Sequence, residues 1–226
     1  MLVITMETGS RPDGRPRWAG RRHDDDRPDA TSGVSSAELF DAVFHALHDG
    51  EQVALGFDCA LTMAVPPDQS RAPAPADADA DANADADALV TLAEPAASQP
   101  GLAELGDLLG ELGMWRPWTT VSTSLARWKA NTSILVWQAV PAPGAATVTP
   151  GAAADSFFRQ LAAASRREAD PTAGTDPTAG TDPAAGTEPA AEAVVNLAAA
   201  AARRAGLFVD PAELARPTVS ITVTGG

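Results

Sequence analysis

Residues 53–66 (VALGFDCALTMAVP) constrain the fold more than any other part of the chain. They begin with an apolar run, typical of a short buried strand, and this run stops at a single charged residue, Asp58. In α/β sheets, ligands commonly bind at the carboxyl ends of the strands, so a carboxylate in this position is a candidate for ligand or metal binding. An aspartate after a strand can also cap the following turn by accepting backbone N–H groups. The residues alone leave both roles open for Asp58.

Helices and strands alternate along the rest of the chain. The predicted strands are residues 1–8, 15–21, 53–57, 134–140 and 218–224. The predicted helices are residues 35–50, 101–113, 150–167 and 193–205, with a last helical turn after Asp210. Two of the strands are continuous apolar runs, as expected for central strands that are buried on both faces. This order predicts a single α/β domain over residues 1–226, in which helices flank a mixed sheet.

Two low-complexity segments interrupt this pattern, at about residues 68–100 and 169–190. The first contains an alternating Asp-Ala run, and the second repeats the hexapeptide DPTAGT. The repeated segment has a proline in every repeat and contains no apolar side chain larger than alanine, a composition that is typical of a flexible spacer. We therefore expect both segments to be disordered insertions. Ten acidic residues lie in or beside them, so most of the net charge of −14 does not indicate an acidic binding face.

The amino-acid composition indicates where the protein is located and which kinds of site it can form. Cys59 is the single cysteine, so an intramolecular disulfide is impossible and a reducing, cytoplasmic location is expected. The chain has no uncharged apolar run of about 18 residues and no signal peptide at its start, so no membrane span is expected. Cys59 could be a nucleophile, but a buried structural thiol is favoured because no histidine is placed near it. Residues 101–113 lack the spacing of a phosphate-binding glycine loop.

Several segments, taken in order, resemble an uncharacterised bacterial family of predicted RNase H-like nucleases. Residues 53–66 look like the strand–Asp–Pro-Leu–Pro segment of that family. The other similar segments are residues 115–118 (WRPW), 135–139 (LVWQA), 193–198 (AVVNLA), 205–207 (AGL) and 216–219 (RPTV). The resemblance is patchy and covers roughly half of the chain.

The resemblance implies an RNase H-like fold and a site in which carboxylates hold two Mg²⁺ ions for phosphoryl transfer on nucleic acid. Asp58 matches the aspartate of the central strand, and Glu7 would stand where the fold usually has an aspartate after the first strand. Asp155 is the candidate for a further metal ligand, with Asp210 as an alternative. Gln138 stands where the relatives have glutamate. The implied catalytic residues are therefore Asp58, Glu7 and Gln138, and the implied metal ligands are Asp58, Glu7 and Asp155.

Gln138 leaves two main functions open, because an amide can accept a metal contact but adds no negative charge and cannot act as a base. The first is a Mg²⁺-dependent nuclease or phosphodiesterase, whose site could be degenerate. The second is a non-catalytic RNase H-like domain that binds a nucleotide, nucleic acid or a protein partner. A small-molecule enzyme on a generic α/β sheet is a third alternative, which no motif supports. The sequence leaves the oligomeric state open.

Overall fold

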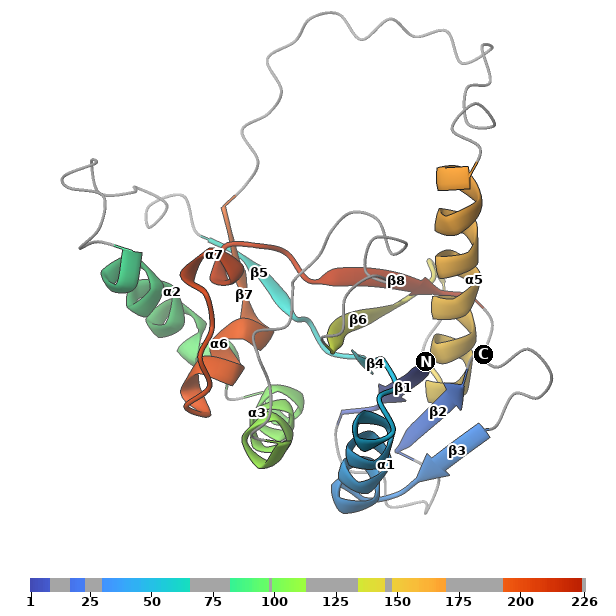
Figure 1. Ribbon diagram of the computed structural model, residues 1–226. Helices are drawn as coiled ribbons and strands as arrows, with labels where there is room; N and C mark the ends of the chain where they lie inside the picture. Colours follow the sequence, from blue (N-terminus) through green and yellow to red (C-terminus); the bar gives the residue numbers. More distant parts are fainter. Residues whose placement is uncertain are drawn as a thin grey trace, which may run out of the picture.

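The computed structural model describes residues 1–8, 17–22, 30–65, 82–97, 99–112, 134–144, 148–169 and 193–224. Six strands of this part of the chain form a mixed sheet with the order β3-β2-β1-β4-β6-β8 (Figure 1). The strands are β1 (Leu2–Met6), β2 (Trp18–Arg22), β3 (Ala30–Gly33), β4 (Val53–Phe57), β6 (Leu135–Pro141) and β8 (Val219–Val223). The expected α/β class, with helices flanking a mixed sheet, is confirmed.

The sheet has an antiparallel part and a parallel part. β1, β2 and β3 form an antiparallel meander, whereas β1, β4, β6 and β8 run parallel to one another. β4 pairs with β1 on one side and with β6 on the other. The residue after β4 is Asp58, so its position is set by the centre of the sheet.

Helices cover both faces of this sheet. α5 (Pro150–Ala169) packs on β1, β2 and β8, and the core beneath it includes Val3, Ala54, Leu135, Trp137, Phe157 and Ile221. α1 (Ser36–His48) and α3 (Pro100–Leu112) contribute to the core of the opposite face, which includes Ile4, Met6, Leu39, Leu55, Leu105 and Val136. Successive residues of the central strands alternate between the two cores, because side chains of a strand point to opposite faces. The central strands are therefore buried on both sides, as their apolar sequences predict.

A second group of elements lies beside α3, on the left of Figure 1. It contains α2 (Ala82–Ala97), α6 (Leu197–Arg204), α7 (Pro211–Leu214) and an antiparallel pair of strands, β5 (Thr62–Ala64) and β7 (Val194–Asn196). α6 contacts both α2 and α3 through buried alanines. Small side chains on α6 allow its neighbours to approach closely, and buried leucines of α3 and α7 belong to the same core.

α2 corrects the prediction that the whole of residues 68–100 is a disordered insertion. Ala86 and Ala93, two turns apart, are buried, and Asp87 forms an ion pair with Arg203 of α6 at 2.7 Å. This helix is held by tertiary contacts of alanine side chains, which a low-complexity composition does not reveal. Residues 68–81 and 170–190 lie outside the described residues.

Two further boundaries differ from the prediction. Residues 30–33, where no strand is predicted, form β3 and pair with β2. Residues 193–205, expected as one helix, divide into β7 and α6, because residues 194–196 pair with β5, about 130 residues earlier in the chain. In both cases, the partner strand decides the structure of a short segment whose own sequence pattern is weak.

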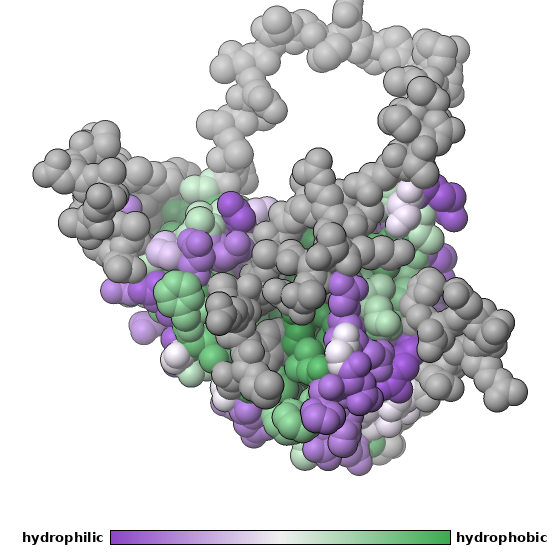
Figure 2. All heavy atoms as spheres, viewed as in Figure 1, coloured by the Kyte–Doolittle hydropathy of each residue, from purple (hydrophilic) through white to green (hydrophobic). Residues whose placement is uncertain are grey.

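Side-chain caps mark the start of two helices. Ser35 is the N-cap of α1 and forms a capping box with Glu38, and Asp210 is the N-cap of α7. The outer surface over α1 is mainly hydrophilic in Figure 2. Phe44 is an exception, being 41% exposed and stacked between the rings of Phe40 and His48. Within the described part of the chain, no helix has both the length and the apolar character needed to cross a membrane.

Candidate functional site

The carboxyl ends of β1, β4 and β6 bring together Glu7, Thr8, Asp58 and Gln138, which we call the carboxyl-edge site. The last paired residues of β1 and β4 are Met6 and Phe57, and the backbone N–H of Asp58 donates to the carbonyl of Met6 at 3.4 Å. Glu7 and Asp58 therefore leave the sheet next to each other at the same edge. Gln138 is paired with Phe57 from the other side of β4.

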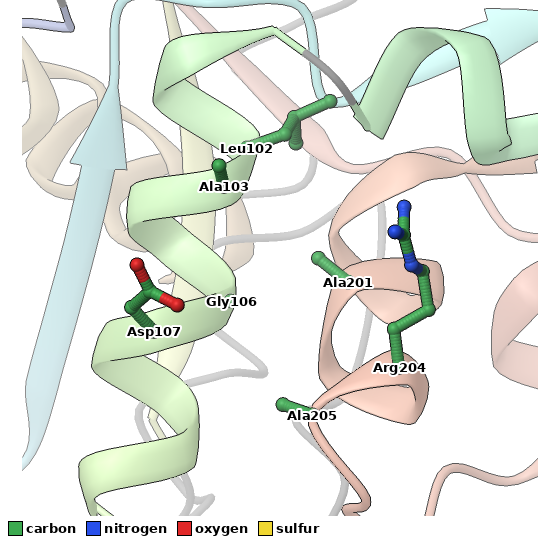
Figure 3. A pocket seen from close by; sticks show the side chains of 7 residues that line it. All are labelled: Leu102, Ala103, Gly106, Asp107, Ala201, Arg204 and Ala205. Atoms are coloured by element: carbon green, nitrogen blue, oxygen red, sulfur yellow. The ribbon is translucent and has the colours of Figure 1, made fainter.

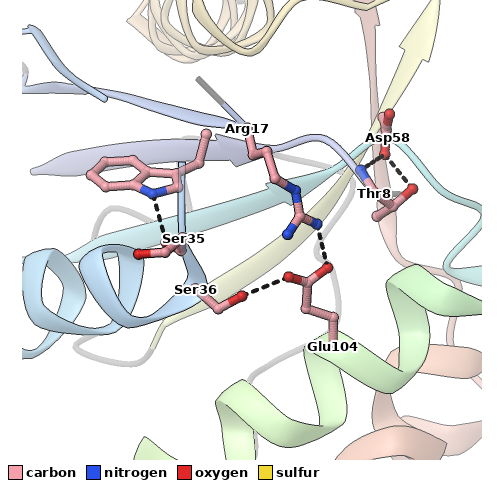
Figure 4. Close-up of polar contacts among 7 residues, drawn as sticks. Thr8, Arg17, Ser35, Ser36, Asp58 and Glu104 are labelled. Atoms are coloured by element: carbon pink, nitrogen blue, oxygen red, sulfur yellow. Dashed lines mark hydrogen bonds and ion pairs between the residues drawn. The ribbon is translucent and has the colours of Figure 1, made fainter. Parts of the chain in front are cut away.

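Thr8 fixes the carboxylate of Asp58. Both the backbone N–H and the hydroxyl of Thr8 donate to Oδ1 of Asp58, each at 2.7 Å (Figure 4). The donors come from a residue 50 positions earlier in the chain, so this carboxylate joins two strands of the sheet instead of capping its own turn. The described residues make no hydrogen bond to the other oxygen, Oδ2, so half of the carboxylate is held and half is available to a ligand.

Gln138 lies at the same edge but has a structural contact. Its Oε1 accepts the backbone N–H of Leu61 at 3.1 Å, and the side chain is half-buried. Leu61 lies in the segment that follows Asp58, so this hydrogen bond helps to hold that segment against β6. The amide oxygen, which is the atom of Gln138 that could contact a cation, therefore already accepts one hydrogen bond.

Asp155 and Asp210 are not part of the carboxyl-edge site. Asp155 lies on α5 and forms an ion pair with Arg21 at 3.3 Å. Arg21 is aligned with Val3, near the start of β1, and from Val3 to Met6 a strand rises by about 10 Å. Asp210 accepts the N–H of Ala212 at 2.9 Å as the cap of α7. The structure therefore joins Asp58 with Glu7 and Gln138, but places Asp155 toward the other end of the strands.

The donor set of the site fits one divalent cation better than two. Among the described residues, no group of three or more His, Cys, Asp and Glu side chains is placed to hold a metal ion. Mg²⁺ is commonly held by one or two carboxylates, with waters and substrate phosphates completing its octahedron. Asp58 and Glu7 supply two carboxylates at this edge of the sheet, the number that such a coordination uses. A second ion would need acidic groups in addition to these two.

A polar cluster that the sequence did not predict lies beside the site. The backbone N–H of Glu7 donates to the backbone carbonyl of Arg17 at 2.7 Å. Its guanidinium binds Oε2 of Glu104 on α3 at 2.7 Å, and the hydroxyl of Ser36 on α1 donates to Oε1 of the same carboxylate at 2.6 Å (Figure 4). Glu104 thus ties α3 to α1 and to the residue that holds Glu7. The residues of this cluster are separated by up to 87 positions, so no local pattern indicates it.

The first turn of α3 packs directly on the site. A Cβ at Gly101 would overlap Cγ2 of Thr8 and would lie 3.0 Å from Sγ of Cys59, so glycine is needed for this close approach. Burial, and then the neighbouring charge of Asp58, raises the pKa of the Cys59 thiol to about 12. The thiol is therefore protonated at neutral pH, which favours the structural role over that of a nucleophile.

A groove of about 260 Å³ lies between α3 and α6. Its walls are mainly small residues, with Asp107 on the α3 side and Arg204 on the α6 side (Figure 3). Gly106 and Ala201 approach each other at its base, where a Cβ at Gly106 would be 3.8 Å from the carbonyl oxygen of Ala201. The groove follows from close packing of two helices through small residues.

Comparisons with protein-family models, with curated proteins and with solved structures find no match to this chain. The function is therefore inferred from the geometry of the carboxyl-edge site and from the resemblance of its segments.

Proposed function

We propose that this chain is an RNase H-like domain that hydrolyses phosphodiester bonds of nucleic acid with Mg²⁺ at the carboxyl-edge site. The observation that carries the proposal is the double hydrogen bond from Thr8 to one oxygen of Asp58, beside Glu7 at the end of the central strands. Catalytic carboxylates are generally fixed in advance by neighbouring donors, because a cation or transition state then meets an oriented charge. A mixed sheet with helices on both faces agrees with the fold that the resemblance implies.

Each residue of the site has a separate role in this proposal. Asp58, through Oδ2, and Glu7 would hold the cation, and Thr8 would keep the carboxylate of Asp58 in place. A bound Mg²⁺ would stabilise the negative charge that develops on the phosphoryl oxygens. Gln138 keeps the segment after Asp58 against β6 by accepting the N–H of Leu61. An amide cannot take a proton from water at neutral pH, so Gln138 is a structural support in this mechanism and does not act as a base.

The second candidate function is a non-catalytic RNase H-like domain that binds a nucleotide, nucleic acid or a protein partner. The contact between Gln138 and Leu61 favours it, because it gives Gln138 a structural role and an amide adds no negative charge to the site. The position of Asp155 beside Arg21 favours it as well, since that acid cannot complete the site in this arrangement.

Cleavage of labelled substrates by the purified full chain tests the first function. Single-stranded DNA, duplex DNA, RNA and an RNA–DNA hybrid would each be incubated with Mg²⁺ or Mn²⁺ and, separately, with a chelator. We expect metal-dependent cleavage that is lost in Asp58→Asn and kept in Asp155→Asn, an acid-to-amide change at a half-exposed site on α5. An absence of cleavage by the wild-type chain, or equal cleavage by Asp58→Asn, would contradict the proposal.

Gln138→Glu distinguishes an active site from one that has lost activity. A glutamate at this position can still accept the N–H of Leu61 and adds the missing negative charge. If the wild-type chain is inactive and Gln138→Glu cleaves, the fold has kept a site that lacks one acid. If wild type and Gln138→Glu both bind nucleic acid without cleaving it, the non-catalytic function is the correct one.

A further inference from the structure

We propose that Thr8 is a positioning residue that fixes the orientation of the Asp58 carboxylate, so that the oxygen not bound by Thr8 faces a divalent cation. This inference rests on the proposed function, because it assigns a role to Thr8 only if a cation binds at the carboxyl-edge site. Neither the sequence patterns nor the resemblance singles out Thr8. The assignment comes from its contacts with Asp58 on one side and with Gly101 on the other.

The two hydrogen bonds from Thr8 remove a freedom that carboxylates usually have. Rotation about the Cβ–Cγ bond turns the plane of the carboxylate, and this terminal torsion is broad in free side chains. Here the N–H and the hydroxyl of Thr8 both reach Oδ1 at 2.7 Å. Rotation of the carboxylate would weaken two charge-assisted hydrogen bonds together. Oδ2 is therefore the oxygen that stays directed away from Thr8.

The side chain of Thr8 is itself held by α3. Its methyl group, Cγ2, lies against Gly101, so closely that a Cβ at position 101 would overlap it. Since a β-branched side chain has few χ1 rotamers, blocking the space around one methyl group fixes the direction of the hydroxyl. α3 is anchored in turn by Glu104, which binds Arg17 and Ser36. The position of Asp58 thus depends on a series of contacts that runs from α3 through Thr8.

Calorimetric titration of the full chain with Mn²⁺ tests the role of Thr8 without requiring activity. The binding that is lost in Asp58→Asn is assigned to the site, which separates it from cation binding by other acidic parts of the chain. Thr8→Val keeps the shape of the side chain and removes the hydroxyl, whereas Thr8→Ser keeps the hydroxyl and removes the methyl group. Thr222→Val on β8 is the matched control, because Thr222 is exposed and its strand is separated from β4 by β6.

We expect Thr8→Val to weaken the Asp58-dependent binding by about 10- to 100-fold, the range seen when a partner of a metal ligand is removed. Thr8→Ser should stay close to wild type, as should Thr222→Val. Thermal unfolding of each variant shows whether it is folded at the temperature of the titration. If Thr8→Val does not fold, Thr8→Cys, with a weaker donor, takes its place with the same expected loss.

Three results would overturn the inference. If wild type and Asp58→Asn bind Mn²⁺ equally, the proposed cation site fails, and the role of Thr8 fails with it. If Asp58→Asn loses binding but Thr8→Val keeps it, the cation site stands and the role of Thr8 alone is wrong. If Thr8→Ser weakens binding as much as Thr8→Val does, the packing of the methyl group matters and the hydroxyl does not.

Discussion

The indole ring of Trp137 on β6 lies directly against Gly56 on β4, its partner in the parallel register. The indole atoms Cζ2, Cε2 and Cη2 occupy the place of a side chain at position 56. The same indole packs on Phe157 of α5, with ring centroids 5.1 Å apart. A glycine in the central strand therefore makes room for the largest side chain in the core beneath α5.

Gly56→Ala should lower the free energy of unfolding, because the new methyl group would overlap the indole of Trp137. Overpacking of a core typically costs about 1–3 kcal/mol. Gly106→Ala on α3 is the matched control, since its nearest neighbour would be 3.8 Å from the new Cβ, and alanine favours a helix over glycine by about 1 kcal/mol. Urea unfolding of both variants measures the difference, and equal stabilities would contradict the packing argument.

The contact between Gly56 and Trp137 illustrates which parts of the fold the sequence predicts. The strands at residues 53–57 and 134–140 follow from their apolar, β-branched composition, and so does their central position. The reason for glycine at position 56 does not, because it depends on which residue of β6 is aligned with it. Similarly, α2 and β7 depend on distant partners: the alanines of α6 and the strand β5.

Asn196→Ala should cost more stability than the loss of an ordinary helix cap. The fully buried side chain of Asn196 accepts the N–H groups of Ala198 and Ala199 and the hydroxyl of Thr218, and its amide donates to the carbonyl of Arg216. A lost cap costs about 1 kcal/mol, and a buried polar group left without a partner costs about 1–3 kcal/mol more.

Asp210→Ala at the start of α7 is the control for Asn196→Ala. Asp210 is an exposed cap with a single hydrogen bond to Ala212, so water can replace it and a loss of about 0.5–1 kcal/mol is expected. Urea unfolding would measure both variants under the same conditions. If Asn196→Ala is no less stable than Asp210→Ala, the buried network around Asn196 contributes little.

The candidate site shows a similar limit of prediction from sequence. Asp58 follows a recognisable buried strand, so the residue itself can be found. Its donors come from Thr8, and the loop between β1 and β2 gives no indication of this contact. The pairing of Asp155 with Arg21 is equally hidden, because it depends on how α5 crosses the sheet. Sequence patterns identify which acids are available, whereas tertiary structure decides which of them meet.

Glu38 should make the stability of α1 depend on pH. The N–H groups of Val34 and Ser35, with the hydroxyl of Ser35, lower the pKa of this carboxyl below 4.5. Because the pKa is lower in the folded state, the contribution of Glu38 is complete above its unfolded pKa and is lost as the pH falls through the folded pKa. Glu38→Gln can still accept these N–H groups but has no charge to lose.

Unfolding curves of wild type and Glu38→Gln from about pH 6 to about pH 3 would isolate this contribution, since the other carboxyl groups titrate in both proteins. We expect the difference in stability between the two to change in favour of Glu38→Gln as the pH falls. A difference that is constant across this range would show that the charge of Glu38 does not strengthen the capping box.

Cys59 should react very slowly with thiol reagents in the folded protein. With a pKa raised to about 12, about one thiol in 10,000 is ionised at pH 8, and the thiolate is the reactive form. While the protein stays folded, the rate of alkylation should keep rising by about tenfold for each pH unit, instead of levelling off near the ordinary thiol pKa. Asp58→Asn removes the second cause of the shift, so it should lower the pKa and speed the reaction, while Asp155→Asn should leave the rate unchanged.

Mass spectrometry after timed alkylation gives these rates, with the urea-unfolded chain as the reference for a free thiol. Rapid labelling of the folded protein at pH 8 would mean that the first turn of α3 does not cover Cys59 as its contact with Gly101 indicates.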